Sequence, residues 1–157
     1  MTRLLTGEEL AETLRRRLPD AILEQKGDSV LVKAESLYEV AQLLKETPGL
    51  EFGFLNSITG VDFVSYFEVV YHVTSLERNH MAVIKTRCYD RESPALPSVV
   101  SLWQGADLQE REVWDLMGIR FEGHPNLKRI MLWEGFQGHP LRKDFVETPN
   151  PQAEASQ

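Results

Sequence analysis

Three strand-like stretches follow one another in the middle of the chain, and they restrict the fold more than any other feature. They cover residues 52–58, 66–76 and 81–89. A short polar link, residues 77–80, joins the second stretch to the third, which predicts an antiparallel hairpin. The fold therefore contains a sheet whose apolar face needs a cover.

Two segments ahead of these strands have the pattern of amphipathic helices that could supply this cover. In residues 8–18 leucines recur at four-residue steps behind a Thr-x-x-Glu capping-box spacing that begins at Thr6, and Pro19 follows. Ser36 begins the same spacing ahead of a second apolar face, which ends near residues 47–49.

The order of these segments predicts the fold class. Residues 21–25 and 29–32 are expected to be short strands on either side of a turn, between the two helices. We therefore expect an α+β fold, in which a small mixed or antiparallel sheet carries helices on one face. A chain of 157 residues buries roughly 68–70% of its unfolded surface, so no disulfide or metal is needed to hold this core.

The chain is expected to form one domain, residues 1–146, with a change of character near its end. Asp107 can cap a third helix, which Gly118 ends. Residues 118–146, called the arm below, are rich in Gly, Pro, His, Lys and Arg, and they have little periodicity. The arm is therefore expected to be ordered but irregular, and the polar residues 147–157 are expected to form a flexible tail.

The third helix places carboxylates among apolar side chains. On a helical wheel Glu110 and Glu112 both interrupt apolar faces, while Arg111 and Asp115 lie together at i,i+4 spacing. A buried carboxylate without partners costs several kcal/mol. If these faces are buried, Glu110 and Glu112 need cations or several hydrogen-bond donors.

The arm can supply such cations. Between residues 120 and 144 there are five basic and three acidic side chains, a local charge of +2 in a chain whose net charge is −7. The candidates nearest the helix in sequence are Lys128, Arg129, Arg142 and Lys143. We infer that the basic arm folds against the acidic helix, or that both belong to a subunit interface. The alternative is a solvated charged helix beside a basic loop.

Several classes of function are disfavoured. The chain has no glycine-rich phosphate loop and no Gly-x-Ser-x-Gly elbow. Its single cysteine, Cys88, cannot ligate an iron–sulfur cluster alone, and no two of its four histidines are spaced i,i+4. The acidic balance, with a pI near 5.1, argues against a dedicated nucleic-acid binder. We expect no catalytic, cofactor-binding or metal-binding residue in this chain.

No apolar run approaches the roughly 18–20 residues that span a bilayer. The first residues lack a signal-peptide core, and they carry acidic residues early, unlike a mitochondrial transit peptide. A cytoplasmic protein, or one attached to a membrane only through partners, is expected.

The charged helix and the arm together resemble a known family. The pattern Glu-Arg-Glu-x-x-Asp-Leu-Met at residues 110–117, followed by the His of residue 124 and the Lys-x-Ile-Met of residues 128–131, is similar to the signature of the 30 kDa (C-type) subunit of respiratory complex I. Residues 97–103 and the Gly-His-Pro-Leu-Arg-Lys-Asp-Phe of residues 138–145 also resemble that family. The resemblance covers about residues 36–146.

The resemblance implies a subunit of the quinone-reducing module in the peripheral arm of a proton-translocating NADH:quinone oxidoreductase. It implies a place beside the 49 kDa-type (D-type) subunit and other peripheral-arm subunits, on the cytoplasmic face of a bacterial membrane. FMN, iron–sulfur clusters and quinone are expected in partner subunits, and no cofactor is expected in this chain. The resemblance gives a structural, interface role to Glu110, Arg111, Glu112, Asp115, His124, Pro125, Lys128, Arg129, His139, Pro140, Leu141, Arg142, Lys143 and Asp144.

Two other interpretations are open at this point. The same domain could serve a ferredoxin-linked complex or a membrane-bound nickel–iron hydrogenase. It could also be a free-standing binding module, which predicts a monomer without a large exposed apolar patch.

Overall fold

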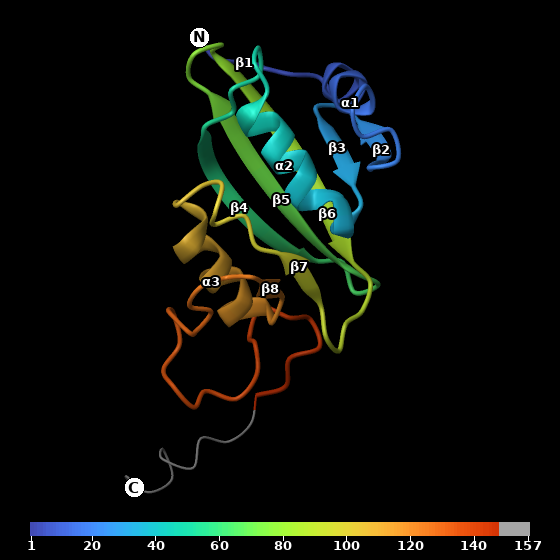
Figure 1. Ribbon diagram of the computed structural model, residues 1–157. Coiled ribbons are helices and arrows are strands. Elements are labelled where there is room, and N and C mark those ends of the chain that lie inside the picture. The colour runs from blue at the N-terminus through green and yellow to red at the C-terminus, as the bar shows by residue number, and fades with distance from the viewer. Residues whose placement is uncertain (148–157) are drawn as a thin grey trace, which may run out of the picture.

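A six-stranded sheet forms the centre of the protein in the computed structural model, which describes residues 1–147 (Figure 1). The elements follow in this order: β1 (Arg3–Leu4), α1 (Gly7–Arg15), β2 (Ile22–Lys26), β3 (Ser29–Val32), a 3-10 turn (Ala34–Ser36), α2 (Leu37–Glu46), β4 (Phe54–Asp62), β5 (Phe67–Ser75), β6 (His80–Cys88), β7 (Ala95–Pro97), α3 (Ala106–Met117) and β8 (Arg120–Glu122).

The predicted hairpin forms the central strands of this sheet. Strands β5 and β6 are antiparallel, and their register runs from the pair Phe67–Cys88 to the pair Ser75–His80. The strand order is β2-β3-β6-β5-β4, and both β1 and β3 run parallel to β6, so the sheet is mixed as expected. Strand β4 continues four residues beyond the predicted end and delivers Asp62 to the edge of the core.

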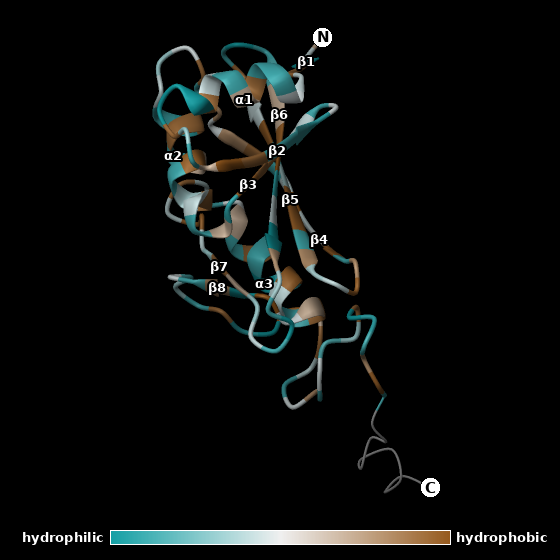
Figure 2. Ribbon diagram, turned by 90° about the vertical axis from the view of Figure 1, so that its right-hand side faces the viewer, coloured by the Kyte–Doolittle hydropathy of each residue, from teal (hydrophilic) through white to brown (hydrophobic). Residues whose placement is uncertain are grey.

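All three helices lie on one face of the sheet, as predicted. Figure 2 shows α1 and α2 along one side of the strands. Helix α3 reaches the same face over β4, where Gly60 pairs with the buried Val69 of β5. A Cβ added at Gly60 would lie 2.5 Å from the sulfur of Met117, so only glycine lets α3 approach the strand this closely.

The helix starts were predicted with mixed success. At α1 the capping box is present: Thr6 Oγ1 accepts the Glu9 N–H at 3.1 Å, and Glu9 accepts the Thr6 N–H at 2.8 Å. This helix ends at Arg15, three residues before the predicted end. The capping box expected at Ser36 is wrong, because the preceding 3-10 turn holds Ser36 in a helical conformation with no side-chain cap.

The third helix begins behind Gly105 and not at Asp107, so the predicted aspartate cap is wrong. Gly118 does end α3, in the left-handed conformation (φ +78°).

The arm leaves α3 and lies at the end of the molecule away from α1 (Figure 1). Its first residues form β8, which pairs in parallel with β7, so the arm is less irregular there than predicted. The predicted tail lies outside the described residues apart from residue 147. Within residues 1–147 no helix combines the length and the apolar character needed to cross a bilayer.

Candidate functional site

A buried carboxylate on α3 holds the start of the arm's irregular stretch. The side chain of Asp115 is fully buried, and its Oδ1 lies 2.6 Å from Nη1 of Arg129. Its Oδ2 accepts three successive backbone N–H groups, from Ile130 at 3.1 Å, Met131 at 2.7 Å and Leu132 at 2.9 Å. One carboxylate therefore fixes the course of four consecutive arm residues.

These partners also keep Asp115 ionised. Burial alone would raise the pKa of this carboxyl, but the N–H of Leu132, the guanidinium of Arg129 and the neighbouring N–H groups outweigh it, and the pKa is lowered. Arg129 in turn donates to the carbonyls of Phe136 (2.8 Å) and Gly138 (2.9 Å), so it links two separate parts of the arm to α3.

The second Gly-His-Pro of the arm lies against the end of the same helix. His139 Nδ1 lies 2.8 Å from the carbonyl oxygen of Asp115 and donates to it, and the N–H of Leu141 donates to the carbonyl of Leu116 at 2.9 Å. A Cβ added at Gly118 would lie 2.7 Å from the His139 ring. The glycine that ends α3 therefore also makes room for the histidine that caps its last carbonyls.

Arg111 does not pair with Asp115, although the two residues are one turn apart. Its guanidinium donates to the carbonyls of Lys128 and Arg129, both at 3.2 Å. This contact places a second side chain of α3 on the same arm segment.

Glu110 is fully buried, as the wheel suggested, but its partners are hydrogen-bond donors and not a cation. Ser98 Oγ donates to it at 2.7 Å and the N–H of Val99 at 2.8 Å. Burial raises the pKa of Glu110, and these two bonds offset only part of the effect.

Glu112 was expected to need partners only if its face of α3 were buried, and that face is not buried. Its side chain is exposed, and the face of α3 that it shares with Leu108, itself 57% exposed, turns to solvent. The arm covers the side of the helix that carries Asp115.

A second buried carboxylate, which the sequence analysis did not single out, holds the far end of the arm. Asp62 lies at the end of β4 and pairs in bidentate fashion with Arg91, at 2.8 and 2.9 Å. It also accepts the N–H of Val64 (2.7 Å) and of Lys143 (2.8 Å). The Arg91 guanidinium, opposed by burial and aided by these N–H groups, lowers the pKa of Asp62 well below its usual range.

The surrounding charges extend this contact. Arg91 also approaches Asp144 at 3.4 Å, and Arg142 pairs with Asp144 at 3.0 Å and donates to the carbonyl of Arg91. The guanidinium groups of Arg91 and Arg142 both lie over the Phe67 ring, 4.4 and 4.9 Å from its centroid. Arg91 and Lys143 are 29 and 81 residues away from Asp62 in the sequence, so no local pattern could reveal these two partners.

The remaining predicted site residues are spread along the arm. His124 is held by the carbonyl of Asp107 at 3.1 Å and by the N–H of Asn126 at 3.0 Å. Pro125 is exposed and Pro140 half-buried. The side chains of Lys128 and Lys143 are exposed and make no ion pair or hydrogen bond within residues 1–147. These residues therefore do not form one compact cluster; the structure brings the arm together at two anchor points, Asp115 and Asp62.

The anchored arm exposes apolar side chains. Met131 is 61% exposed, Trp133 51% and Leu141 59%. Large apolar side chains held in fixed positions at a surface are typical of protein–protein contacts.

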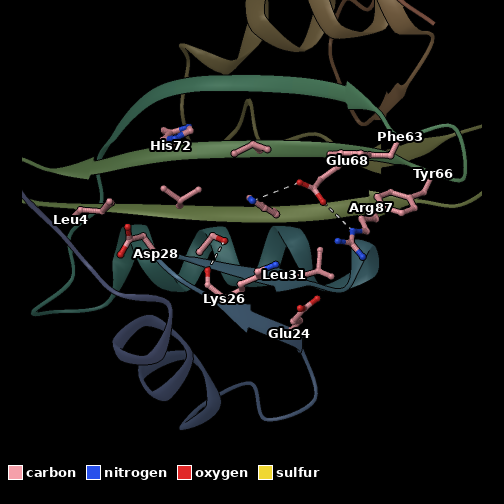
Figure 3. A pocket seen from close by; sticks show the side chains of 14 residues that line it. Leu4, Glu24, Lys26, Asp28, Leu31, Phe63, Tyr66, Glu68, His72 and Arg87 are labelled. Carbon is pink, nitrogen blue, oxygen red and sulfur yellow. Dashed lines mark hydrogen bonds and ion pairs between the residues drawn. The ribbon is translucent and has the colours of Figure 1, made fainter. Parts of the chain in front are cut away.

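The opposite face of the sheet carries an open groove of about 800 Å³ (Figure 3). Glu68 lies at its centre, 3.8 Å from Lys85 and 3.0 Å from Arg87, and Arg87 lies over the Tyr66 ring at 4.3 Å. The groove is lined by three acidic and three basic side chains: Glu24, Asp28, Glu68, Lys26, Lys85 and Arg87. These charges balance in number, and the central ones pair with each other.

The side chains that could bind a metal, and the single thiol, were compared with what such sites require. Residues 1–147 hold no group of three or more His, Cys, Asp or Glu side chains placed to bind a metal. Burial raises the pKa of the Cys88 thiol to about 11, which keeps it protonated and unreactive.

Known respiratory proteins resemble this chain along most of its length. The sequence profile of the family described as "Respiratory-chain NADH dehydrogenase, 30 Kd subunit" matches residues 30–151. A C subunit of the NADH-quinone oxidoreductase of Roseiflexus sp. is 44% identical over 147 residues, covering 89% of this chain and 84% of the relative. A C/D subunit of the NADH-quinone oxidoreductase of Phocaeicola vulgatus is 42% identical over 125 residues, which are 79% of this chain but 24% of that relative.

Two solved structures are similar as well. A trypsin-resistant fragment of Nqo5 is 33% identical with a TM-score of 0.55, covering 73% of this chain and 99% of the fragment. A polypeptide of the membrane-bound sulfane sulfur reductase, an archaeal respiratory membrane complex, is 28% identical with a TM-score of 0.70, covering 96% of this chain and 89% of that one.

Proposed function

The chain belongs to the family of 30 kDa subunits of respiratory-chain NADH dehydrogenase, and we propose that it is a structural subunit in the peripheral arm of an NADH-quinone oxidoreductase. The observation that carries this proposal is the pair of buried aspartates, Asp115 and Asp62, that hold the arm against the domain. An arm held this firmly, with its apolar side chains outward, suits a contact with a neighbouring subunit.

We propose that this neighbour is the D-type (49 kDa-type) subunit. The Phocaeicola vulgatus relative is named as a combined C/D subunit, and the matched region is about a quarter of its length. When two subunits occur as one polypeptide in a relative, their separate counterparts are natural neighbours.

We propose further that the protein adds no active site and no redox group to the complex. Its buried carboxylates are occupied by structural donors: Glu110 by Ser98 and Val99, and Asp115 by Arg129 and arm N–H groups. A general acid or base needs a free path to substrate. Electron transfer would then take place in partner subunits that carry flavin and iron–sulfur clusters, and the chain would lie on the cytoplasmic face of the membrane through those partners.

Purification from native membranes through a tag on this chain tests the proposal. We expect a large assembly that contains a D-type subunit, flavin and iron–sulfur absorbance, and inhibitor-sensitive NADH:quinone activity. The isolated chain should show no absorbance above about 320 nm, because it would hold no flavin and no iron–sulfur cluster. Recovery of the chain alone from the soluble fraction would contradict a subunit role, and a visible chromophore in the pure chain would contradict the absence of a redox group.

The alternative of a related membrane complex is less well supported. Identity to the polypeptide of the archaeal sulfane sulfur reductase is 28%, compared with 44% to the NADH-quinone oxidoreductase relative from Roseiflexus sp.. A free-standing binding module would not be expected to keep several large apolar side chains exposed along the arm.

A further inference from the structure

We infer that Trp133 is the anchor of the arm's docking surface, and that the partner protein offers it an apolar pocket flanked by carboxylates. This inference rests on the proposed function, because it names the chemistry of the contact that holds the subunit in place. The docking surface is defined here as Lys128, Met131, Trp133, Leu141 and Lys143.

The indole of Trp133 is exposed, yet its position is fixed from behind. Its ring meets Phe136 edge-on, with ring centroids 6.1 Å apart and an interplanar angle of 82°. Phe136 lies under the guanidinium of Arg129 at 5.6 Å, and the same guanidinium lies 5.8 Å from the ring of Trp114 on α3. A continuous stack therefore runs from the core helix to the exposed indole.

Two glycines make this stack possible. A Cβ added at Gly135 would lie 3.1 Å from the Trp133 ring, and Gly135 adopts φ +89°. A Cβ added at Gly138 would lie 3.1 Å from the ring of Phe145, which stacks on Phe136 with ring centroids 6.2 Å apart. The indole lies directly on the turn that follows it, so few of its rotamers remain accessible.

Preorganisation of this kind makes the binding free energy of a contact more favourable. A side chain that is already ordered loses little conformational entropy when a partner covers it. Tryptophan is enriched among residues that carry most of the binding energy at interfaces, and such residues fill well-packed pockets. With 51% of its surface exposed, Trp133 still has about half of its area available to a partner.

The exposed charges of the arm define the partner further. Lys128 and Lys143 are exposed and make no ion pair within the described residues, although the chain as a whole has a net charge of −7. The other Lys and Arg side chains of the arm, Arg120, Arg129 and Arg142, already have carboxylate partners. Exposed cations on the same arm as the apolar anchor suit a partner surface with acidic residues, which would steer association and fix its orientation.

The test compares variants of the full chain, each carrying a tag, in cells that lack the untagged copy. We expect Trp133→Ala to lower the fraction of protein that co-migrates with the complex by about 30-fold. Trp133→Phe should retain most of the binding, and Glu12→Ala, at an exposed site on α1 far from the arm, should behave as wild type. Because Trp133 lies outside the core, the melting temperature of the purified protein should be the same for all three variants.

A variant of Arg129 separates this inference from the proposed function. Arg129→Ala removes the ion pair with Asp115 that holds the arm to α3, and it should abolish assembly because the arm is released and not because the docking surface has changed. If Arg129→Ala prevents assembly while Trp133→Ala assembles as wild type, the inference about Trp133 is wrong and the role of the arm stands. If the tagged wild-type chain enters no complex at all, the proposed function itself fails.

Hydroxyl-radical footprinting gives a second readout that does not depend on a variant. Oxidation of the peptide that carries Trp133 should fall at least about 10-fold between the free protein and the purified complex, because a hot-spot side chain is fully desolvated in its pocket. The charge reversal Lys128→Glu with Lys143→Glu should reduce assembly more strongly at low salt than at high salt. An equally oxidised Trp133 in the complex, or a charge reversal that improves assembly, would overturn the inference.

Discussion

Replacing Asp115 with asparagine should release the arm from α3 while the sheet stays folded. All four groups that meet this carboxylate are donors: the Arg129 guanidinium and the N–H groups of residues 130–132. An asparagine can accept with only one atom, and its amide nitrogen would face a donor. The variant therefore loses the ion pair. If its amide oxygen keeps the three backbone N–H groups, its amide nitrogen faces the Arg129 guanidinium, donor against donor.

The magnitude follows from the surroundings of the pair. A hydrogen bond to a charged group contributes about 1.5–3 kcal/mol, and removing one partner of a buried ion pair costs about 3–5 kcal/mol. Arg129 retains 15% side-chain exposure and three carbonyl partners, so its charge stays satisfied without the carboxylate. We therefore expect the lower value, about 3 kcal/mol, which is a roughly 150-fold larger equilibrium constant for opening of the arm.

Amide hydrogen exchange of the purified protein measures this opening directly. The N–H groups of residues 130–132 should exchange roughly 150-fold faster in Asp115→Asn, at about 3 kcal/mol of lost protection, while those of β5 and β6 keep their rates. Glu112→Gln is the matched control on the same helix, because Glu112 is exposed, and it should exchange as wild type. Unchanged exchange of residues 130–132 in Asp115→Asn would refute the reasoning.

Three further outcomes are expected. Glu110→Gln should be tolerated, since glutamine can accept from Val99 and donate to Ser98. The pKa of Glu110 is raised in the folded state, so the wild-type free energy of unfolding falls as pH rises above about 4.3. Glutamine does not titrate, so urea unfolding of Glu110→Gln should show a smaller fall than wild type between that pH and neutral pH. Arg91→Lys should lower the free energy of unfolding by about 2–3 kcal/mol in the same assay, because an ammonium cannot pair in bidentate fashion with the carboxylate at the end of β4. The pKa values of Asp62 and Asp115 are lowered in the folded state, so these groups stabilise the protein above about pH 3.9, and this stability is lost as pH falls through the folded-state pKa values. As the pH is lowered, an acid-active protease should therefore cleave the arm before the far-ultraviolet circular dichroism changes.

Much of the fold could be predicted from local patterns. The hairpin of β5 and β6, the first capping box and the glycine that ends α3 each depend on residues close together in the sequence, and each is confirmed. The helix starts at Ser36 and Asp107 were mispredicted because the preceding turns, and not the side chains, decide where those helices begin.

The site was only partly predictable, for a physical reason. A helical wheel gives the angular order of side chains but not which side of the helix becomes covered. The wheel placed both Glu110 and Glu112 among apolar side chains, but only Glu110 is buried, and the side of α3 that carries Glu112 faces solvent. The contact between the basic arm and the acidic helix was correctly anticipated, but its carboxylate is Asp115, and the anchor at Asp62 depends on partners far away in sequence.

Photo-crosslinking from residue 141 in the assembled complex tests the central claim most directly. Leu141 is 59% exposed on the arm, so a photoreactive amino acid in its place should crosslink to the D-type subunit in native membranes. The same amino acid at exposed residue 12, on α1 at the opposite end of the molecule, serves as the control and should not reach that subunit. A crosslink from residue 141 to the D-type subunit is the predicted result, whereas crosslinking from residue 12 alone would contradict an arm-mediated contact.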